Sequence, residues 1–310
     1  MYSTQPLVAG LATALFVTFP ASAWENLPQK PYGQADLLPA PGQFVITPYY
    51  SYTRWLHFYD GKGDKRVIPQ ELSEEDFEVN DGMVNFEYGI SRNLALDLTL
   101  GLTTGATRFF DVSNEPHTDW GMMDTQVGVR YRIVDEAEQA PSGMPTLTVR
   151  LGGIIAGTYQ SGFPFAPGSG GSGGEVGFFA NKKLGDYGVN TFADMSWRFR
   201  NHDIPVKVQT RLGLYYAIPW ETGALRMFTP HVAYKFLNSF GGSEVSGNGP
   251  DLQYSADVRE RAHILDSGIG ITDQAGRELH FYFDWGFSGE NTPAVMTYGL
   301  YLSFPFGGKK

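Results

Sequence analysis

Charged side chains recur at every second position inside apolar stretches of the chain. Asp97 stands between two leucines in the stretch 94–102, and Arg130 stands between Val129 and Tyr131. A β-strand points alternate side chains to opposite faces. The acids and bases therefore gather on one face, where they can pair with one another or line a path for polar solutes, while the apolar residues gather on the other face.

The same alternation assigns further polar side chains to the charged face. We expect the following residues to line an interior and any solute path through it: Glu87, Asp97, Asp124, Arg130, Arg132, Arg150, Asp194, Arg198, Lys207, Arg211, His231, His280, Tyr282 and Asp284. Folding about the turn at Arg92 puts Glu87 opposite Asp97, and the next connections bring Arg130 and Arg150 beside them. Because acid then lies beside acid and base beside base, the two pairs must neutralise each other. A structural role for this belt is favoured over solute selection.

Short motifs elsewhere match the residue patterns of catalytic or metal sites but lack other features that those sites require. Residues 170–174 have the G-x-S-x-G pattern of a nucleophile elbow, but that motif needs a strand–turn–helix setting, and this Gly/Ser run is typical of an external loop. Asp60–Asp64 has the outline of a calcium loop, yet Lys62 occupies a ligand position. The acidic run 71–81 could attract divalent cations, although a solvated loop is favoured.

The histidines show no metal-ligand spacing; they stand at positions 57, 117, 202, 231, 263 and 280. By parity, His231 and His280 lie on the charged face and could contact a solute, with ordinary polar lining as the favoured alternative. No Ser–His spacing indicates the catalytic pair that an outer-membrane phospholipase requires. We therefore expect no enzyme activity, no cofactor and no metal.

Alternating segments separated by turn residues follow one another from residue 44 to residue 306. Twelve strands are expected, over 44–56, 77–90, 94–102, 120–133, 146–159, 175–183, 189–200, 206–218, 225–237, 263–272, 279–287 and 294–306. Their connections alternate between short and long, as in outer-membrane barrels with short periplasmic turns and long external loops. The exceptions are 134–145, which is long for a turn, and 201–205 and 288–293, which are short for loops. An even number of strands places both termini in the periplasm.

The polarity of these strands is reversed relative to a soluble β-sandwich, whose inner face is apolar. A soluble core would not hold full charges such as Asp97, Asp194, Arg211 and Asp284 together. An apolar outer face suits lipid, and a charged inner face suits water or ion pairs. We therefore expect an all-β fold, a transmembrane antiparallel β-barrel over residues 44–306 in the bacterial outer membrane, in contact with its lipids and lipopolysaccharide.

The composition and the N-terminus agree with this expectation. The chain has 310 residues, no cysteine and a net charge of -10, which argues against nucleic-acid binding. An apolar run over 7–19 followed by Ala-x-Ala at 21–23 predicts a cleaved signal peptide, residues 1–23. The run is too short for the alternative, a membrane anchor helix. Residues 24–43 are Pro-rich and are expected to be a periplasmic leader, either a partial plug of the barrel or a disordered tail.

Aromatic side chains form two groups. Those near strand ends suit the girdles at the two membrane interfaces: Tyr49, Tyr50, Trp120, Tyr131, Trp197, Tyr216, Trp220, Tyr234 and Trp285. Those with inward parity could stack on an aromatic solute or fill a narrow lumen: Phe179, Phe192, Tyr215, Tyr282 and Tyr301. The last strand, Thr297 to Phe304, is similar to the signal read by the barrel-assembly machinery, although residues 305–310 follow it.

Three stretches resemble the family described as the outer-membrane component of the phenol meta-degradation pathway, which is loosely related to hydrocarbon and fatty-acid uptake barrels. They are residues 89–97, 120–132 and 163–185. The resemblance implies passive uptake of small, aromatic or hydrophobic solutes through a narrow charged lumen, and it implies no catalytic residue. The alternative is a structural or surface-interaction barrel with a closed lumen; an outer-membrane lipid-modifying enzyme is less favoured.

Overall fold

The computed structural model describes residues 37–66, 78–107, 117–138, 143–158, 171–185, 188–201, 204–220, 223–241 and 259–308. The expected signal peptide and most of the expected leader lie outside these residues. Within the described ranges, no helix has the length and apolar character needed to cross a membrane.

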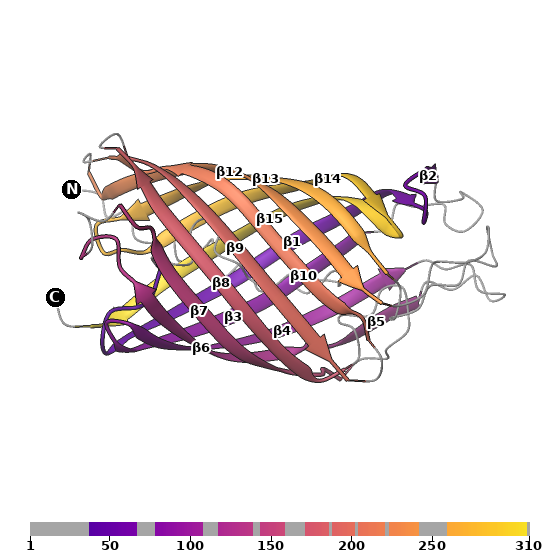
Figure 1. The fold of residues 1–310 in the computed structure, drawn as a ribbon, viewed down its shortest axis with the longest axis horizontal. Coiled ribbons are helices and arrows are strands. Elements are labelled where there is room, and N and C mark those ends of the chain that lie inside the picture. Colours follow the sequence, from indigo (N-terminus) through magenta and orange to yellow (C-terminus); the bar gives the residue numbers. More distant parts are fainter. Residues whose placement is uncertain are drawn as a thin grey trace, which may run out of the picture.

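The regular structure of the described chain consists of β-strands. In chain order they are β1 (Gln43–Tyr59), β2 (Lys65–Arg66), β3 (Glu78–Ser91), β4 (Leu94–Thr107), β5 (His117–Met122), β6 (Thr125–Val134), β7 (Thr146–Ile155), β8 (Gly173–Leu184), β9 (Val189–Arg200), β10 (Val206–Tyr216), β11 (Ile218–Pro219), β12 (Leu225–Phe240), β13 (Arg261–Asp273), β14 (Glu278–Glu290) and β15 (Thr292–Gly307). They form one sheet that curls into a tilted cylinder (Figure 1).

The sheet closes on itself. Hydrogen-bonded neighbours follow the order β10-β9-β8-β7-β6-β4-β3-β1-β15-β14-β13-β12, and β12 pairs back to β10. β5 and β6 both pair with β4 and share one position in the wall, whereas β2 and β11 are two-residue additions to β1 and β12. The predicted fold, a closed antiparallel barrel of twelve strands, is confirmed.

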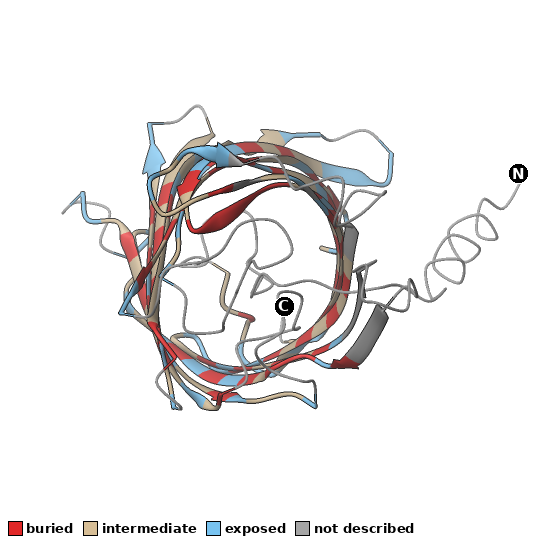
Figure 2. Ribbon diagram, turned by 90° about the vertical axis from the view of Figure 1, so that its right-hand side faces the viewer, coloured by how far each residue is buried: buried red, intermediate tan, exposed pale blue. Residues whose placement is uncertain are grey.

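The alternation seen in the sequence places polar side chains inside and apolar side chains outside. On β4, Leu96 is 42% exposed and Leu102 is 64% exposed, whereas Asp97 between them is only 6% exposed. Figure 2 shows this as alternating exposed and buried segments around the ring of strands. Exposed leucine, valine and aromatic side chains on the outside are the surface expected for contact with lipid.

The expected strand 120–133 is wrong in one respect, because a β-bulge divides it. Leu102 pairs with Met122 and Thr99 pairs with Gln126, so three steps along β4 match four steps along its partner. The Met123 amide donates a hydrogen bond to the Gly101 carbonyl at 2.9 Å. One extra residue reverses the parity at this point, so Met123 and Asp124 are both buried.

Other expected boundaries differ as well; β4, for example, runs to Thr107 and not to residue 102. The range 206–218 is not one strand, since β10 ends at Tyr216 and Ile218–Pro219 forms the separate strand β11. The range 146–159 is too long, since β7 ends at Ile155. Strand β2, which pairs with the end of β1, was not expected.

The two ends of the barrel differ in their connections. β1 begins and β15 ends at the same end, where Gln43 pairs with Gly307. Most of the tight turns lie at this end, including the one at Arg92–Asn93 that joins β3 to β4, although the β6–β7 connection there is longer. The opposite end carries most of the longer connections, but β14 and β15 are joined there by Asn291 alone. There the calcium-like segment is a turn, in which Asp60 Oδ1 accepts hydrogen bonds from the amides of Lys62 at 2.9 Å and Asp64 at 3.0 Å.

Candidate functional site

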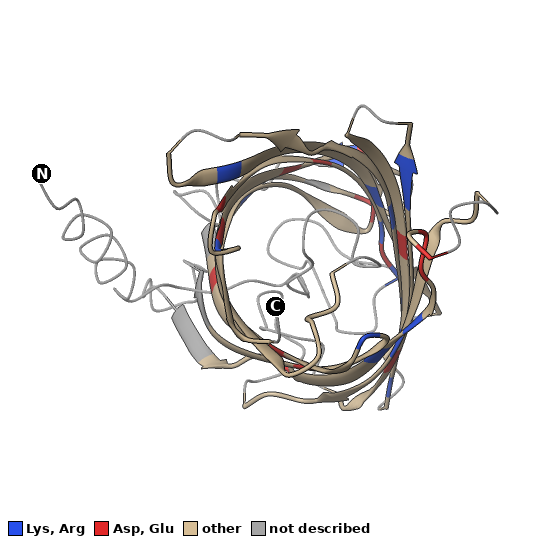
Figure 3. Ribbon diagram, turned by 90° about the vertical axis from the view of Figure 1, so that its left-hand side faces the viewer, with Lys and Arg blue, Asp and Glu red and all other residues tan. Residues whose placement is uncertain are grey.

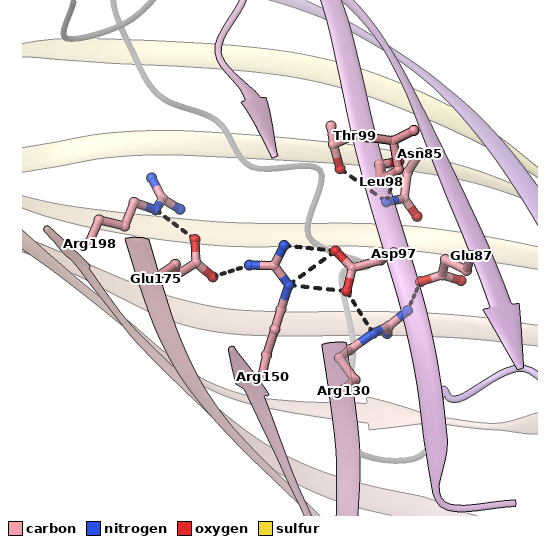
Figure 4. A network of polar contacts seen from close by, with 9 residues as sticks. All are labelled: Asn85, Glu87, Asp97, Leu98, Thr99, Arg130, Arg150, Glu175 and Arg198. Atoms are coloured by element: carbon pink, nitrogen blue, oxygen red, sulfur yellow. Dashed lines mark hydrogen bonds and ion pairs between the residues drawn. The ribbon is translucent and has the colours of Figure 1, made fainter. Parts of the chain in front are cut away.

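A chain of ion pairs crosses the inner wall from β3 to β9 (Figure 4). This first network consists of Glu87, Asp97, Arg130, Arg150, Glu175 and Arg198, which lie on β3, β4, β6, β7, β8 and β9. Arg130 pairs with Glu87 through Nη2 and lies 3.4 Å from Asp97 Oδ2 through Nε. The predicted contact between Asp97 and Arg130 is therefore present.

Arg150 joins the two halves of the first network. Its Nη2 lies 2.7 Å from Asp97 Oδ1, and its Nη1 lies 2.9 Å from Glu175 Oε1. Arg198 Nε then reaches Glu175 Oε2 at 3.2 Å. Acids and bases alternate along the wall, three carboxylates against three guanidinium groups, so the first network has no net charge.

Backbone register explains how these pairs form. Glu87 pairs with Asp97 and Arg130 pairs with Arg150 across neighbouring strands, as predicted. Asp97 itself stands opposite Gly128, two residues from Arg130, so the contact is diagonal. A β-carbon at Gly128 would lie 2.6 Å from Arg150 Nε, so the absence of a side chain there gives the Arg150 guanidinium its place.

A second network crosses the other side of the wall, from β9 to β14. It consists of Asp194, Arg211, His231, Lys235, Asp266 and Asp284. Arg211 pairs with Asp194, with Nε 3.1 Å from Oδ2, and Nη1 lies 3.6 Å from Asp266 Oδ2. Lys235 Nζ lies 3.4 Å from Asp266 Oδ2 and 2.7 Å from Asp284 Oδ2. All three carboxylates are at most 6% exposed.

His231 joins the second network at its centre. Its Nε2 lies 3.0 Å from Asp266 Oδ1, and the residue is 6% exposed. The ring also lies beside that of His280 on β14, with centroids 5.1 Å apart. A β-carbon at Gly268 on β13 would lie 2.5 Å from the His231 ring and 2.9 Å from the His280 ring. Glycine at this position allows the two imidazoles to meet over β13.

The remaining predicted lining residues lie outside the two networks. Asp124 pairs with Arg200 at 2.7 Å. Lys207 pairs with Glu260 at 3.2 Å and is partly exposed. Arg132 is not part of the wall's networks but pairs with Asp135 at 3.1 Å in the β6–β7 connection.

Two predicted aromatic positions pack along the wall. The His280 ring is stacked on Tyr301, with centroids 5.1 Å apart and planes 4° apart. The Tyr282 ring lies against Gly299 of β15, where a β-carbon would approach it to 2.0 Å.

Tyr49 corrects the expected aromatic girdle. It is 5% exposed and lies on the inner face, where its ring is 5.1 Å from that of Tyr301. With Met83 and Met123 these two tyrosines form a buried apolar cluster. The inner wall is therefore not polar throughout.

Several network members were missed in the sequence analysis. Glu175, Lys235 and Asp266 complete the two networks, and Arg200 pairs with Asp124. The signal was available for Glu175 and Lys235, which lie in expected strands with the parity of Phe179 and His231. The expected strand 263–272 contained no predicted lining residue that could mark the parity of Asp266. Which charged side chains pair with one another, in contrast, depends on the register between neighbouring strands, and this register is set across connections of unequal length.

The described end of the leader enters the barrel. Leu37 packs against Phe192 and Ala233, which lie on β9 and β12. In the order of neighbours β9 is six positions from β1, on the opposite side of the wall. The chain then returns to the wall, where the Gly42 amide donates to the Gly89 carbonyl at 2.8 Å. Figures 2 and 3 show this coil inside the ring of strands.

The turn end carries a further ion-pair cluster outside the membrane-spanning strands. Arg92 pairs with Asp135 at 3.3 Å and also with Glu138. Partial burial alone would raise the pKa of the Glu136 carboxyl. Hydrogen bonds from Lys182 Nζ at 2.6 Å and from the Lys183 amide at 3.0 Å outweigh this and hold the pKa below its ordinary value. These contacts tie the β6–β7 connection to the end of β8.

Comparison with known proteins shows likeness at the level of fold. No family model and no curated protein sequence matches the chain. The fold is similar to that of an outer membrane channel from Pseudomonas putida F1, with a TM-score of 0.63 and 15% identity over 90% of this chain and 100% of that chain.

Two further solved barrels are less similar in fold. The β domain of the Bordetella autotransporter BrkA has a TM-score of 0.48 and 12% identity over 86% of this chain and 100% of that chain. The monoaromatic hydrocarbon channel CymD has a TM-score of 0.43 and 8% identity over 86% of this chain and 89% of that chain.

The chain is a bacterial outer-membrane β-barrel. Its strands close into a ring through the pairing of β10 with β12, and its outer face is apolar, as the hydrocarbon region requires. The predicted location in the outer membrane is confirmed.

Proposed function

We propose that this barrel is a channel for passive passage of small solutes across the outer membrane. The observation that carries the proposal is the inner wall, where two ion-pair networks cover the strands from β3 to β14 on the side away from lipid. Paired charges fix side chains against the wall instead of leaving them to fill the interior. The similar fold of a solved outer membrane channel supports the same function.

The solute class follows from the sequence resemblance described above. Small aromatic or hydrophobic molecules are therefore the first candidates, and we propose no catalytic residue. Entry would be restricted, because a barrel of this strand number is narrow and because the coil around Leu37 lies inside it. We propose that residues 24–43 act as a partial plug.

A closed, structural barrel is the second candidate. It is favoured by the low exposure of the inner side chains, such as Arg211 at 1% and Tyr301 at 1%. Such a barrel would act through its long connections and not through its lumen.

Conductance separates the two candidates. The purified barrel in a planar bilayer should give discrete openings if it is a channel, and a silent record contradicts the channel proposal. A liposome-swelling series with small neutral solutes, matched in size and either aromatic or aliphatic, would then rank the solute class. Equal rates for matched aromatic and aliphatic solutes would contradict an aromatic preference.

We propose that the turn end faces the periplasm. The chain has no cysteine, so a single introduced cysteine reports one position. Ala275→Cys lies in the β13–β14 turn, and Lys62→Cys lies in an exposed turn at the opposite end. On intact cells a membrane-impermeant maleimide should label Lys62→Cys and not Ala275→Cys. The reverse pattern would overturn the orientation.

Assembly and lipid contacts complete the proposal. β15 contains Thr297 to Phe304, the expected signal for the barrel-assembly machinery, and it pairs with β1 to close the wall. The outward side chains of this strand include Tyr298, which is 49% exposed and lies against Tyr52 and Phe283. We propose that this face contacts outer-membrane lipids and lipopolysaccharide.

A further inference from the structure

The two networks differ in their charge balance. The first has three carboxylates and three guanidinium groups. The second has three carboxylates, on Asp194, Asp266 and Asp284, but only two permanent cations, on Arg211 and Lys235. With all three carboxyl groups ionised and a neutral imidazole on His231, the described members of the second network would carry one net negative charge.

His231 stands where a third cation would balance the second network. Asp266 is the carboxylate at the centre of the second network. Its Oδ2 lies near Arg211 and Lys235, and its Oδ1 lies near His231. Of these three neighbours, only the imidazole changes its charge between pH 8 and pH 5 in the ordinary case. A protonated ring would donate from Nε2 to Asp266 Oδ1 at the observed 3.0 Å.

We propose that His231 takes up the proton that balances the second network, and that it thereby sets the charge of the inner wall. At high pH the wall near β12–β14 is net negative, and at mildly acidic pH it is neutral. This inference rests on the proposed channel function for its consequence: the channel favours cations at high pH and loses part of that preference as His231 is protonated.

The groups that face His231 come from every strand packed around it. They are Arg211 and Tyr215 on β10, Lys235 on its own strand, Asp266 on β13, His280, Tyr282 and Asp284 on β14, and, beyond His280, Glu278 and Tyr301. Arg211 and Lys235 each lie near two of the three carboxylates, and among the described residues His231 is the remaining side chain that contacts Asp266 and can become a cation.

Geometry distinguishes His231 from His280. His231 contacts Asp266 directly at 3.0 Å, whereas His280 Nδ1 lies 3.4 Å from Glu278 at the rim of the network and its ring is stacked on Tyr301. Two adjacent imidazolium ions would repel each other, so charging one disfavours charging the other. The proton is therefore assigned to the ring beside Asp266.

Nitrogen-15 NMR of histidine side chains tests the assignment directly. The folded barrel in detergent micelles would be labelled on histidine and titrated from pH 8 to pH 5, and His231→Gln would identify the His231 signals. Glutamine preserves a hydrogen-bond donor towards Asp266, and heat-modifiable migration on gels checks that the variant is folded. The expected result is conversion of the His231 ring to imidazolium within this range. A ring that stays neutral at pH 5, or that is already charged at pH 8, overturns the proposal.

Reversal potentials in a salt gradient test the consequence. The wild-type cation-to-anion permeability ratio should fall several-fold from pH 8 to pH 5, and that fall should disappear in His231→Gln. The matched control is His263→Gln, since His263 lies on the outer face against Tyr234 at 2.6 Å and Phe236; it should behave as wild type. An unchanged pH dependence in His231→Gln contradicts the inference, whereas a silent bilayer with an intact NMR titration contradicts only the channel.

Discussion

At Asp97, one carboxylate holds two arginines. It contacts Arg130 and Arg150 while being only 6% exposed. Removing its charge leaves two guanidinium groups in a buried site with one partner fewer each, and an uncompensated buried charge is costly. The first network therefore depends on Asp97 more than on Glu87 or Arg198, the residues at its two ends.

We expect Asp97→Asn to destabilise the barrel by about 3–5 kcal/mol. Denaturant-dependent folding into lipid vesicles would measure the free energy of unfolding. The control is Arg92→Gln in the exposed turn, where loss of the pairs with Asp135 and Glu138 should cost less than about 1 kcal/mol. Equal losses for the two variants would refute a special role for the buried pair.

Leu98 and Thr99 test the two faces at neighbouring positions. Leu98 has the outward parity of Leu96, and Thr99 is buried and accepts a hydrogen bond from Asn85 Nδ2 at 3.0 Å. Leu98→Arg should destabilise by about 2–4 kcal/mol near the membrane midplane. Thr99→Ala should cost about 1 kcal/mol, the loss of one hydrogen bond. The same vesicle assay applies, and similar tolerance at both positions would contradict the assigned faces.

The β5–β6 bulge shows what can and cannot be predicted for an element. Alternation gave strand locations and faces, including Asp97 and Arg130, because a strand has a strict period of two. It could not give the bulge, because Met123 and Asp124 also fit an uninterrupted alternation of outward and inward side chains along a single strand. It also could not give the Asp97–Gly128 register, which depends on the connection between β4 and β6.

Single-residue deletions probe this bulge. Deleting Met123 removes the extra residue and leaves Met122 outward and Asp124 inward, so alternation is preserved on both sides. We expect the variant to fold. Deleting Val127 instead turns Arg130 towards lipid, and we expect little folded protein. The folded fraction on heat-modifiability gels compares them, and the idea fails if both deletions behave alike.

The β6–β7 connection predicts a dependence of stability on pH. The folded pKa of Glu136 lies below its ordinary value, so the folded state binds fewer protons than the unfolded state. Its stabilising contribution is therefore present at neutral pH, above the unfolded value, and is lost as the pH falls through the lowered folded value.

Glu136→Gln tests that dependence. The variant should be less stable than wild type at pH 7, and the difference should shrink as the pH falls from about 4, the ordinary value, through the lowered folded value at which the wild-type carboxyl becomes protonated. Lys182→Gln removes the principal hydrogen-bond donor and should give the same trend. The measurement is the free energy of unfolding in detergent from pH 7 to pH 3. A difference that does not vary with pH would contradict the assigned contacts.

For the whole molecule, the leader is the decisive segment. Only its end is described, and that end crosses the interior to Phe192 and Ala233. The sequence indicated a leader without a strand but could not choose between plug and tail, because a Pro-rich segment has no periodic pattern that fixes its location.

Deleting residues 25–40 removes the Leu37 contact. As a partial plug, the leader should reduce conductance and solute uptake, so the deletion should increase both. The matched control is Leu37→Ala, which keeps the leader but loses the apolar contact and should give a smaller increase. Unchanged conductance and uptake after the deletion would refute the plug.

The pairing of β1 with β15 has a consequence for how the molecule is made. Its first and last strands are neighbours, with Gln43 opposite Gly307. Until the final strand has been synthesised and exported, the growing sheet has two edge strands with unpaired backbone groups, and each can pair with another chain. No intermediate can close into a barrel, because β15, which completes the wall by pairing with β1, is the last strand to be made. The risk of misassembly is therefore greatest just before completion, and a chaperone would have to hold the almost finished sheet until its two ends meet.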